Sequence, residues 1–181
     1  FRIGYRRKKA NSIVGLPEIR TALFVSCIFV LAIPDVAFAV GFQVRFAPDP
    51  DDRPLKVGIW YPSDAPTSRI DGLREPVAFE GRLIGGDLPL TIISHGNGGA
   101  LSGHSDTALA LANEGFVVVS VTHTGDNFRD QSYAGMTRWF TDRPRHIQRV
   151  LDYMLTQWPE RTHLDENRIG FFGFSMGGYT G

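Results

Sequence analysis

Residues 168–178 read RIGFFGFSMGG, a short apolar run that leads directly into a serine flanked by glycines. The first six residues have the length and continuity of a strand that is buried on both faces. The rest matches G-x-S-x-G, which after a strand forms a sharp turn that exposes a serine hydroxyl. The residues Gly173, Gly177 and Gly178 leave room for such a turn, because they carry no side chain. The stretch therefore predicts Ser175 as a nucleophile at the carboxyl edge of a sheet.

Further strands are predicted upstream of this stretch. Continuous apolar runs predict strands buried on both faces at Leu90–Ser94 and Phe116–Thr122. Strand-like patterning also marks Gly41–Phe46 and Leu55–Tyr61, which a turn-forming cluster separates. The long segment that follows has at most one short strand, near Val77–Phe79.

Two helices are predicted between the buried strands. One covers about Ser105–Glu114 and is closed by Gly115. The second has Thr141 or Asp142 as its cap and Pro144 in its first turn. Its apolar face consists of Ile147, Val150, Leu151, Met154, Leu155 and Trp158. This alternation predicts an α/β fold, a mostly parallel sheet with helices on both faces.

A second motif, His95-Gly96-Asn97-Gly98-Gly99, directly follows the first buried strand. A glycine-rich turn at this place presents a backbone N–H to a developing oxyanion. We expect the backbone N–H groups of Asn97 and Met176 to form the oxyanion hole, with His95 and Gly96 supporting the loop. The alternatives are an ordinary loop or a phosphate cradle. Nucleotide binding is disfavoured, since the motif lacks the Walker lysine and the G-x-G-x-x-G spacing.

The chain resembles the α/β-hydrolase family, and more narrowly its dienelactone hydrolase-like branch, which overlaps with platelet-activating-factor acetylhydrolase-like esterases. The narrower resemblance lies in PLTIISHGNGG (89–99), ALANEGFVVVSVTH (110–123), DRPRHIQRVLDYML (142–155) and RIGFFGFSMGG (168–178). Enzymes that act on dienelactone itself carry a cysteine at the elbow, where this chain has Ser175. The resemblance therefore implies a serine hydrolase that cleaves carboxylic esters through an acyl-enzyme. A serine peptidase or an acyltransferase on the same fold is the alternative.

In this family the triad acid and histidine follow the nucleophile in the chain. Only three residues, 179–181, follow Gly178 here. We expect residues 40–181 to form the N-terminal half of an α/β-hydrolase catalytic domain, truncated after the nucleophile elbow. By itself this half lacks a general base and is expected to be inactive. A catalytically inactive module is the further alternative.

Aromatic side chains and a histidine are candidates for lining a substrate pocket. The connection 124–141 contains Phe128, Tyr133 and Trp139, and His123 ends the preceding strand. The equal alternative is that these side chains pack the connection onto the domain. Catalysis by His95 in the order Asp, His, Ser is a weaker alternative. No metal site and no cofactor are predicted, because no histidine pairs with carboxylates at ligand spacing.

The first 39 residues differ in composition from the rest. They carry six basic and two acidic residues, and the basic cluster Arg6–Lys9 precedes an apolar run, Ala22–Ile33. Pro34 and a small-x-small sequence, Ala37–Ala39, complete the pattern of a secretory signal peptide cleaved before Val40. The apolar run has twelve residues, fewer than the roughly 20 that cross a bilayer, so no stable membrane anchor is expected. The chain is predicted to be exported to the periplasm or secreted.

Charge and cysteine content narrow the function classes further. The formal net charge of zero gives no electrostatic case for nucleic-acid binding. The single cysteine, Cys27, lies in the predicted signal peptide, so the mature chain has neither disulfides nor a thiolate metal site. The expected partner is a small-molecule ester substrate, and the sequence leaves the oligomeric state open.

Overall fold

The structure is a computed structural model that describes residues 39–181. The predicted signal peptide, residues 1–39, lies outside the described residues except for Ala39, which begins the first strand. In the described part of the chain, no helix has both the length and the apolar character needed to span a membrane.

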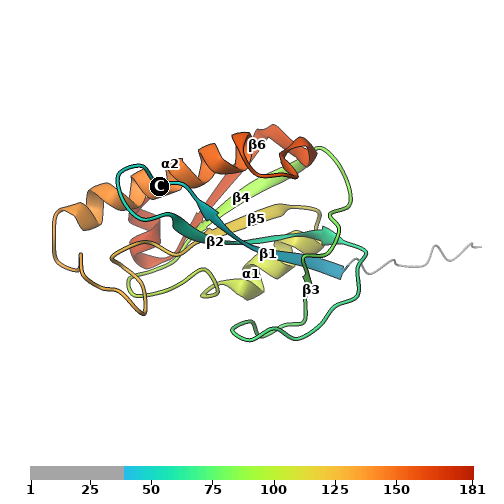
Figure 1. Cartoon of the computed structure of the whole chain (residues 1–181), viewed down its shortest axis with the longest axis horizontal. Helices are drawn as coiled ribbons and strands as arrows, with labels where there is room; N and C mark the ends of the chain where they lie inside the picture. The colour runs from blue at the N-terminus through green and yellow to red at the C-terminus, as the bar shows by residue number, and fades with distance from the viewer. Residues whose placement is uncertain (1–38) are drawn as a thin grey trace, which may run out of the picture. The chain divides into compact units, whose positions relative to one another are not determined.

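Six strands form one sheet in the order β3-β1-β2-β5-β4-β6 (Figure 1). The strand β4 pairs in parallel with β5 and β6, and β3 pairs in parallel with β1, whereas β2 is antiparallel to both of its neighbours. The strands are β1 (Ala39–Ala47), β2 (Leu55–Ser63), β3 (Ala78–Phe79), β4 (Leu88–Ser94), β5 (Val117–Val121) and β6 (Leu164–Gly173).

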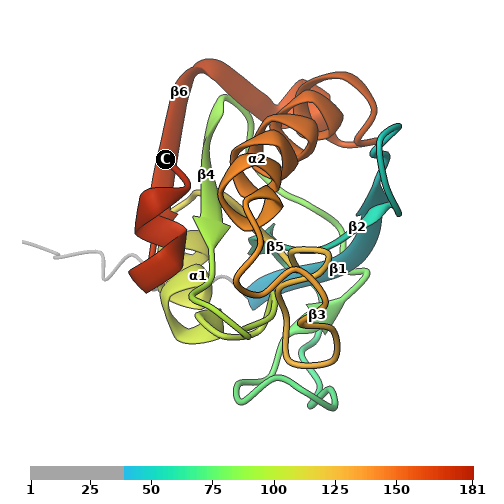
Figure 2. The ribbon, with the colours of Figure 1, turned by 90° about the vertical axis from the view of Figure 1, so that its left-hand side faces the viewer.

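Two α-helices cover opposite faces of the sheet, α1 (Ser105–Asn113) and α2 (Arg138–Thr156) (Figures 1 and 2). The alternation of strand side chains explains both contacts. In β4, Ile92 packs into the cluster that contains α2, whereas the next residue, Ile93, packs into the cluster that contains α1. The predicted α/β fold with helices on both faces is confirmed. Two short 3₁₀ helices complete the chain, η1 (Arg161–His163) and η2 (Ser175–Tyr179).

The strand order reverses at β4. The chain leaves β4, passes through α1 to β5 on one side, and then returns through α2 to β6 on the other side. Right-handed crossovers in opposite directions place α1 and α2 on opposite faces. In open α/β sheets, ligands bind where the strand order reverses in this way. The segments that leave the carboxyl ends of β4 and β6 are the two predicted motifs.

The helix α2 begins earlier than predicted. It starts at Arg138, after Thr137, so neither predicted cap residue caps it and Pro144 lies inside the helix. The added turn is held by Arg138, whose guanidinium donates to Asp142 at 2.9 Å and covers the ring of Tyr133. Pro144 leaves the carbonyl of Phe140 without its helical donor, and Phe140 lies in the first turn of the helix and is 58% exposed.

The strand β6 also differs from its prediction. The sequence predicts a strand buried on both faces, but Ile169, Phe171 and Phe172 are 36–40% exposed. That prediction is wrong for the described residues, because β6 is the edge of the sheet and pairs only with β4. The strand is also longer than predicted, since it begins at Leu164 and passes a register shift opposite the bond between Pro89 and Leu90.

Candidate active site

The serine elbow (Gly173–Gly177) is shaped by close contacts between backbone atoms. Ser175 has φ +52°, a left-handed conformation that costs a non-glycine residue about 1–3 kcal/mol. A Cβ on Gly173 would overlap the carbonyl of Gly177, and a Cβ on Gly177 would overlap the carbonyl of Ser94. A Cβ on Gly178 would meet its nearest atom at 3.6 Å, an ordinary contact. The first two glycines are therefore required by the turn, and Gly178 is not.

The glycine turn (His95–Gly99) lies directly against the serine elbow. The Phe174 N–H donates to the carbonyl of Ser94 at 3.1 Å, which joins the elbow to the end of β4. A Cβ on Gly96 would lie 3.3 Å from the Cβ of Ser175, so a larger residue there would press on the serine. The structure thus brings the two predicted motifs together at the carboxyl end of β4.

Three polar groups at this junction are free to meet a ligand. Within residues 39–181, the N–H groups of Asn97 and Met176 donate no hydrogen bond, and the hydroxyl of Ser175 has no partner. Ser175 is also exposed to solvent. The two motifs thus contribute one exposed serine hydroxyl and two unengaged backbone N–H groups, which are the kinds of group that acyl transfer uses.

His95 is held in one tautomer by two backbone contacts. The His123 N–H donates to Nε2 of His95 at 3.2 Å, so Nε2 is unprotonated and Nδ1 carries the hydrogen. That Nδ1–H donates to the carbonyl of Gly96 at 2.6 Å. Burial lowers the pKa of His95 to about 4, so the ring is neutral at pH 7. Both nitrogens are occupied, and the contact with Gly96 is the one expected of a loop-supporting residue rather than of a base for Ser175.

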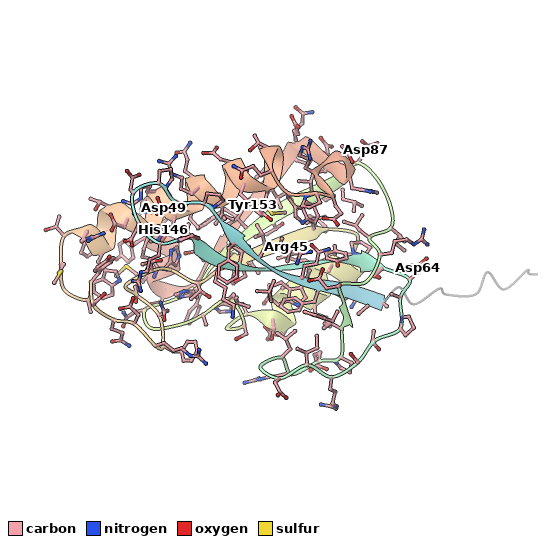
Figure 3. The ribbon with its side chains drawn as sticks, viewed as in Figure 1. Arg45, Asp49, Asp64, Asp87, His146 and Tyr153 are labelled. Carbon is pink, nitrogen blue, oxygen red and sulfur yellow. The ribbon has the colours of Figure 1, made fainter. Side chains whose placement is uncertain are left out.

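A row of buried polar side chains continues from His95 under the helix α2. Ser94 Oγ accepts from Arg143 at 3.1 Å and forms a hydrogen bond with Nε2 of His123 at 2.9 Å. Nδ1 of His123 and Nδ1 of His146 share a hydrogen bond at 3.1 Å, and Nε2 of His146 lies 3.7 Å from Asp49. Figure 3 shows His146 and Asp49 side by side.

The histidines of this row are neutral. Burial, and secondarily the nearby charge of Arg143, lowers the pKa of His123 well below its ordinary value. Burial and the charge of Arg145 lower the pKa of His146 to about 4. The row therefore adds no positive charge to the site at neutral pH.

The four pocket candidates have different surroundings. His123 is completely buried and does not line a pocket. The ring of Tyr133 packs on Gly125 and its hydroxyl donates to Asp52 at 2.8 Å, so this residue holds the connection in place. Trp139 donates its Nε1–H to Asp126 and borders Met176 in a small hollow. Phe128 is 63% exposed.

Phe128 also lines a cavity of about 330 Å³ beside the glycine turn. The cavity reaches the turn through Ala100, Leu101 and Ser102, and Ser175 is not among its lining residues. A group of three histidine, cysteine, aspartate or glutamate side chains that could hold a metal does not occur between residues 39 and 181.

Two residues of the site escaped the sequence analysis, Asp126 and Arg143. They form a buried ion pair at 2.5 Å, with side chains 1% and 3% exposed. Burial acts to raise the pKa of Asp126, but hydrogen bonds from Trp139, Gly98 and Arg143 outweigh it and keep the pKa below its ordinary value. A signal was present, because Arg143 lies three and seven residues before His146 and Val150 and extends the buried stripe of α2.

Comparison with known proteins gives one family match and several structural matches. The family model described as platelet-activating factor acetylhydrolase, isoform II, matches residues 67–171. This range contains the glycine turn, Asp126 and Arg143 and stops four residues before Ser175. No curated protein matches the chain.

Two solved structures support the fold. A ferulic acid esterase from Streptomyces cinnamoneus is 22% identical with a TM-score of 0.65, and the match covers 82% of this chain and 56% of that one. A dienelactone hydrolase-like promiscuous phosphotriesterase from metagenomic libraries is 17% identical with a TM-score of 0.52, covering 78% and 52%. The chain thus spans about half the length of the solved structures that it matches.

Proposed function

The chain belongs to the platelet-activating factor acetylhydrolase, isoform II, family of hydrolases, and we propose that it supplies the nucleophile and the oxyanion hole of a serine esterase. The observation that carries this proposal is the left-handed Ser175, exposed and without a partner, packed against the glycine turn. Backbone strain at an exposed serine is typical of nucleophile elbows.

In the proposed reaction, Ser175 Oγ attacks the carbonyl carbon of a carboxylic ester and passes its proton to a general base. The negative oxygen of the tetrahedral intermediate accepts hydrogen bonds from the N–H groups of Asn97 and Met176. Collapse expels the alcohol, which takes up the proton, and leaves an acyl-enzyme. Water then attacks the acyl-enzyme in the same way, releasing the acid and restoring the serine.

We propose that the general base of this reaction is none of the five histidines of the chain. None of them donates to or accepts from Ser175. Because the chain spans 52–56% of the matched structures, we propose that the acid and the histidine come from sequence beyond residue 181 in the complete protein. The test is to sequence the coding DNA beyond the codon for Gly181. It should encode further apolar runs typical of buried strands, then an acidic residue and then a histidine.

The nucleophile is tested in the full-length protein with p-nitrophenyl acetate and a fluorophosphonate probe. We expect Ser175→Ala to lose at least 10³-fold in kcat and all labelling by the probe. The matched control is Ser132→Ala, which removes an exposed serine hydroxyl from the connection before α2 and should retain full activity. Esterase activity that survives in Ser175→Ala would exclude the proposed nucleophile, and an inactive unlabelled parent would favour a module without catalysis.

The acceptor of the acyl group is tested separately. Hydrolysis is proposed over acyl transfer because Ser175 is exposed to water. Adding a competing alcohol should therefore give mainly free acid, whereas a dominant ester product identifies an acyltransferase, and cleavage of peptide amides at comparable rates identifies a peptidase.

We also propose that the protein is exported and acts on small-molecule esters outside the cytoplasm. The support is the sequence pattern of residues 1–39. Mass spectrometry of extracellular or periplasmic material should find Val40 as the N-terminus, and an intact N-terminus on that material would contradict cleavage.

A further inference from the structure

The carboxylate of Asp126 gathers hydrogen-bond donors from two separate segments. Its Oδ1 accepts from the side chain of Asn97 at 2.7 Å and from the N–H of Gly98 at 2.9 Å, both in the glycine turn. Its Oδ2 accepts from Arg143 at 2.5 Å and from Trp139, both in α2. One buried carboxylate thus ties the glycine turn to the helix.

The guanidinium of Arg143 continues this connection to the serine elbow. Its Nη2 donates to the carbonyl of His95, and its Nε donates to Thr180 Oγ1 at 3.1 Å. The hydroxyl of Thr180 in turn donates to the carbonyl of Met176 at 3.1 Å. Arg143 therefore contacts the start of the glycine turn directly and the elbow through one side chain.

These contacts hold both residues whose N–H groups are the proposed oxyanion donors. Asn97 is fixed through its own side chain and through the next peptide N–H, which leaves its backbone N–H unengaged. Met176 is fixed through its carbonyl, which likewise leaves its N–H unengaged. The bonded groups belong to the peptides that directly follow the two N–H-bearing peptides, so these hydrogen bonds restrain the backbone on which both N–H groups lie.

Stability alone is a weak reason for a pair of this kind. Burying two charges is costly, and well-packed apolar residues of similar volume often stabilise a fold equally well or better. Oxyanion stabilisation, in contrast, depends on donors that are positioned before the charge develops. A fully hydrogen-bonded buried pair supplies that rigidity.

We propose that Asp126 and Arg143 are positioning residues that set the two oxyanion-binding N–H groups relative to Ser175. The inference rests on the proposed function. The two side chains are buried and make no hydrogen bond to Ser175, and they act through Asn97, Gly98 and Thr180. Their loss should therefore weaken binding of the transition state and leave binding of the ester ground state largely intact.

The test uses Asp126→Asn and Arg143→Met in the full-length protein. Each variant should lower kcat about 10–100-fold for p-nitrophenyl acetate and change KM less than about threefold. Amide hydrogen exchange in the segment 95–101 should become faster in both variants. Asp126→Asn removes the charged acceptor of the Gly98 N–H, and Arg143→Met removes the ion-pair partner of that acceptor. The exchange measurement does not depend on activity.

The matched control is Asp142→Asn. Asp142 is also a buried carboxylate, lies next to Arg143 on α2 and pairs with Arg138 and Arg145, but it does not contact the glycine turn. Its loss should lower stability and leave kcat within about twofold. A kcat loss equal to that of Asp126→Asn would overturn the positioning role in favour of general destabilisation.

The remaining outcomes are also decisive. If Asp126→Asn keeps kcat within twofold and exchange at 95–101 is unchanged, the inference is wrong. If the charge variants do not fold, Thr180→Val removes the bond to the Met176 carbonyl together with the bond that Thr180 accepts from Arg143, and leaves the Asp126–Arg143 pair in place. An unchanged kcat in that variant overturns the elbow arm of the proposal. Failure of the esterase proposal itself is seen independently, as retained activity in Ser175→Ala.

Discussion

The serine elbow and the glycine turn lie against each other, but different interactions shape them. The elbow is determined by backbone sterics, since Gly173 and Gly177 leave no space for a Cβ and Ser175 adopts a left-handed conformation. The glycine turn is determined by side-chain hydrogen bonds from buried polar groups, chiefly His95 and Asp126. Changes in side-chain charge should therefore disrupt the turn, and changes in side-chain volume should disrupt the elbow.

Acid should have the largest effect, and it should act through the buried histidines of the glycine turn and of α2. The pKa of His95 and of His146 is about 4 in the folded chain, below the ordinary value of 6.5. The unfolded chain therefore binds protons first, and stability that is complete above pH 6.5 is lost as the pH falls toward 4. Lowering a pKa by one pH unit corresponds to about 1.4 kcal/mol, so each histidine contributes about 3 kcal/mol.

This dependence is measured by urea unfolding of the full chain at several values between pH 7 and pH 4.5. The upper part of the range, from pH 7 to about pH 5.5, stays well above the ordinary pKa of the carboxylates, about 4, so the change there reports histidines. His163→Gln, outside the buried row, should show the same loss as the parent chain. A free energy of unfolding that stays constant across the range would contradict the lowered pKa values. It would show that the buried histidines are already protonated at pH 7 or are accessible to water.

The next largest effect is expected at the elbow. Gly177→Ala places a Cβ against the carbonyl of Ser94, where backbone and not a flexible side chain must move. We expect a loss of about 3 kcal/mol or more in the free energy of unfolding. Gly178→Ala is the matched control, since its Cβ fits at 3.6 Å, and it should stay within about 1 kcal/mol of the parent. Equal losses in the two variants would show that the elbow is not limited by sterics.

The smallest effect is a gain in stability at the proposed nucleophile. Ser175→Gly removes the strain of φ +52°, and part of the gain is offset by the greater freedom of glycine in the unfolded chain. We expect Ser175→Gly to be about 1 kcal/mol more stable than Ser175→Ala, which keeps the strain. Thermal unfolding of the two variants side by side measures the difference, and a less stable glycine variant would mean that the elbow is unstrained.

The same contrast explains what the sequence could predict. The elbow is a local feature, because its glycines and serine are adjacent and follow a recognisable strand. The Asp126–Arg143 pair joins residues 17 positions apart through a helix start that the sequence pattern placed too late. Charged residues in a connection are ordinarily solvated, so nothing local distinguished the buried Asp126 from an exposed charged residue of the same connection such as Arg129.

The sheet shows where pattern reasoning reached its limit. A run of apolar residues predicts a strand and its approximate bounds, and five of the six strands lie where continuous or alternating runs placed them. The pattern cannot report which strand is at the edge, because that depends on the order of pairing. For this reason the apolar character of β6 predicted burial, although Phe171 and Phe172 are partly exposed.

The fixed tautomer of His95 gives the protein a spectroscopic probe of its own. The Nδ1–H of this 1% exposed side chain is held in a hydrogen bond to Gly96, the residue just before the proposed oxyanion donor Asn97. A buried imidazole hydrogen of this kind exchanges slowly with water and gives its own proton resonance, whose position follows the length of the hydrogen bond. The geometry of the glycine turn can thus be followed by nuclear magnetic resonance without a substrate and without any label at the serine.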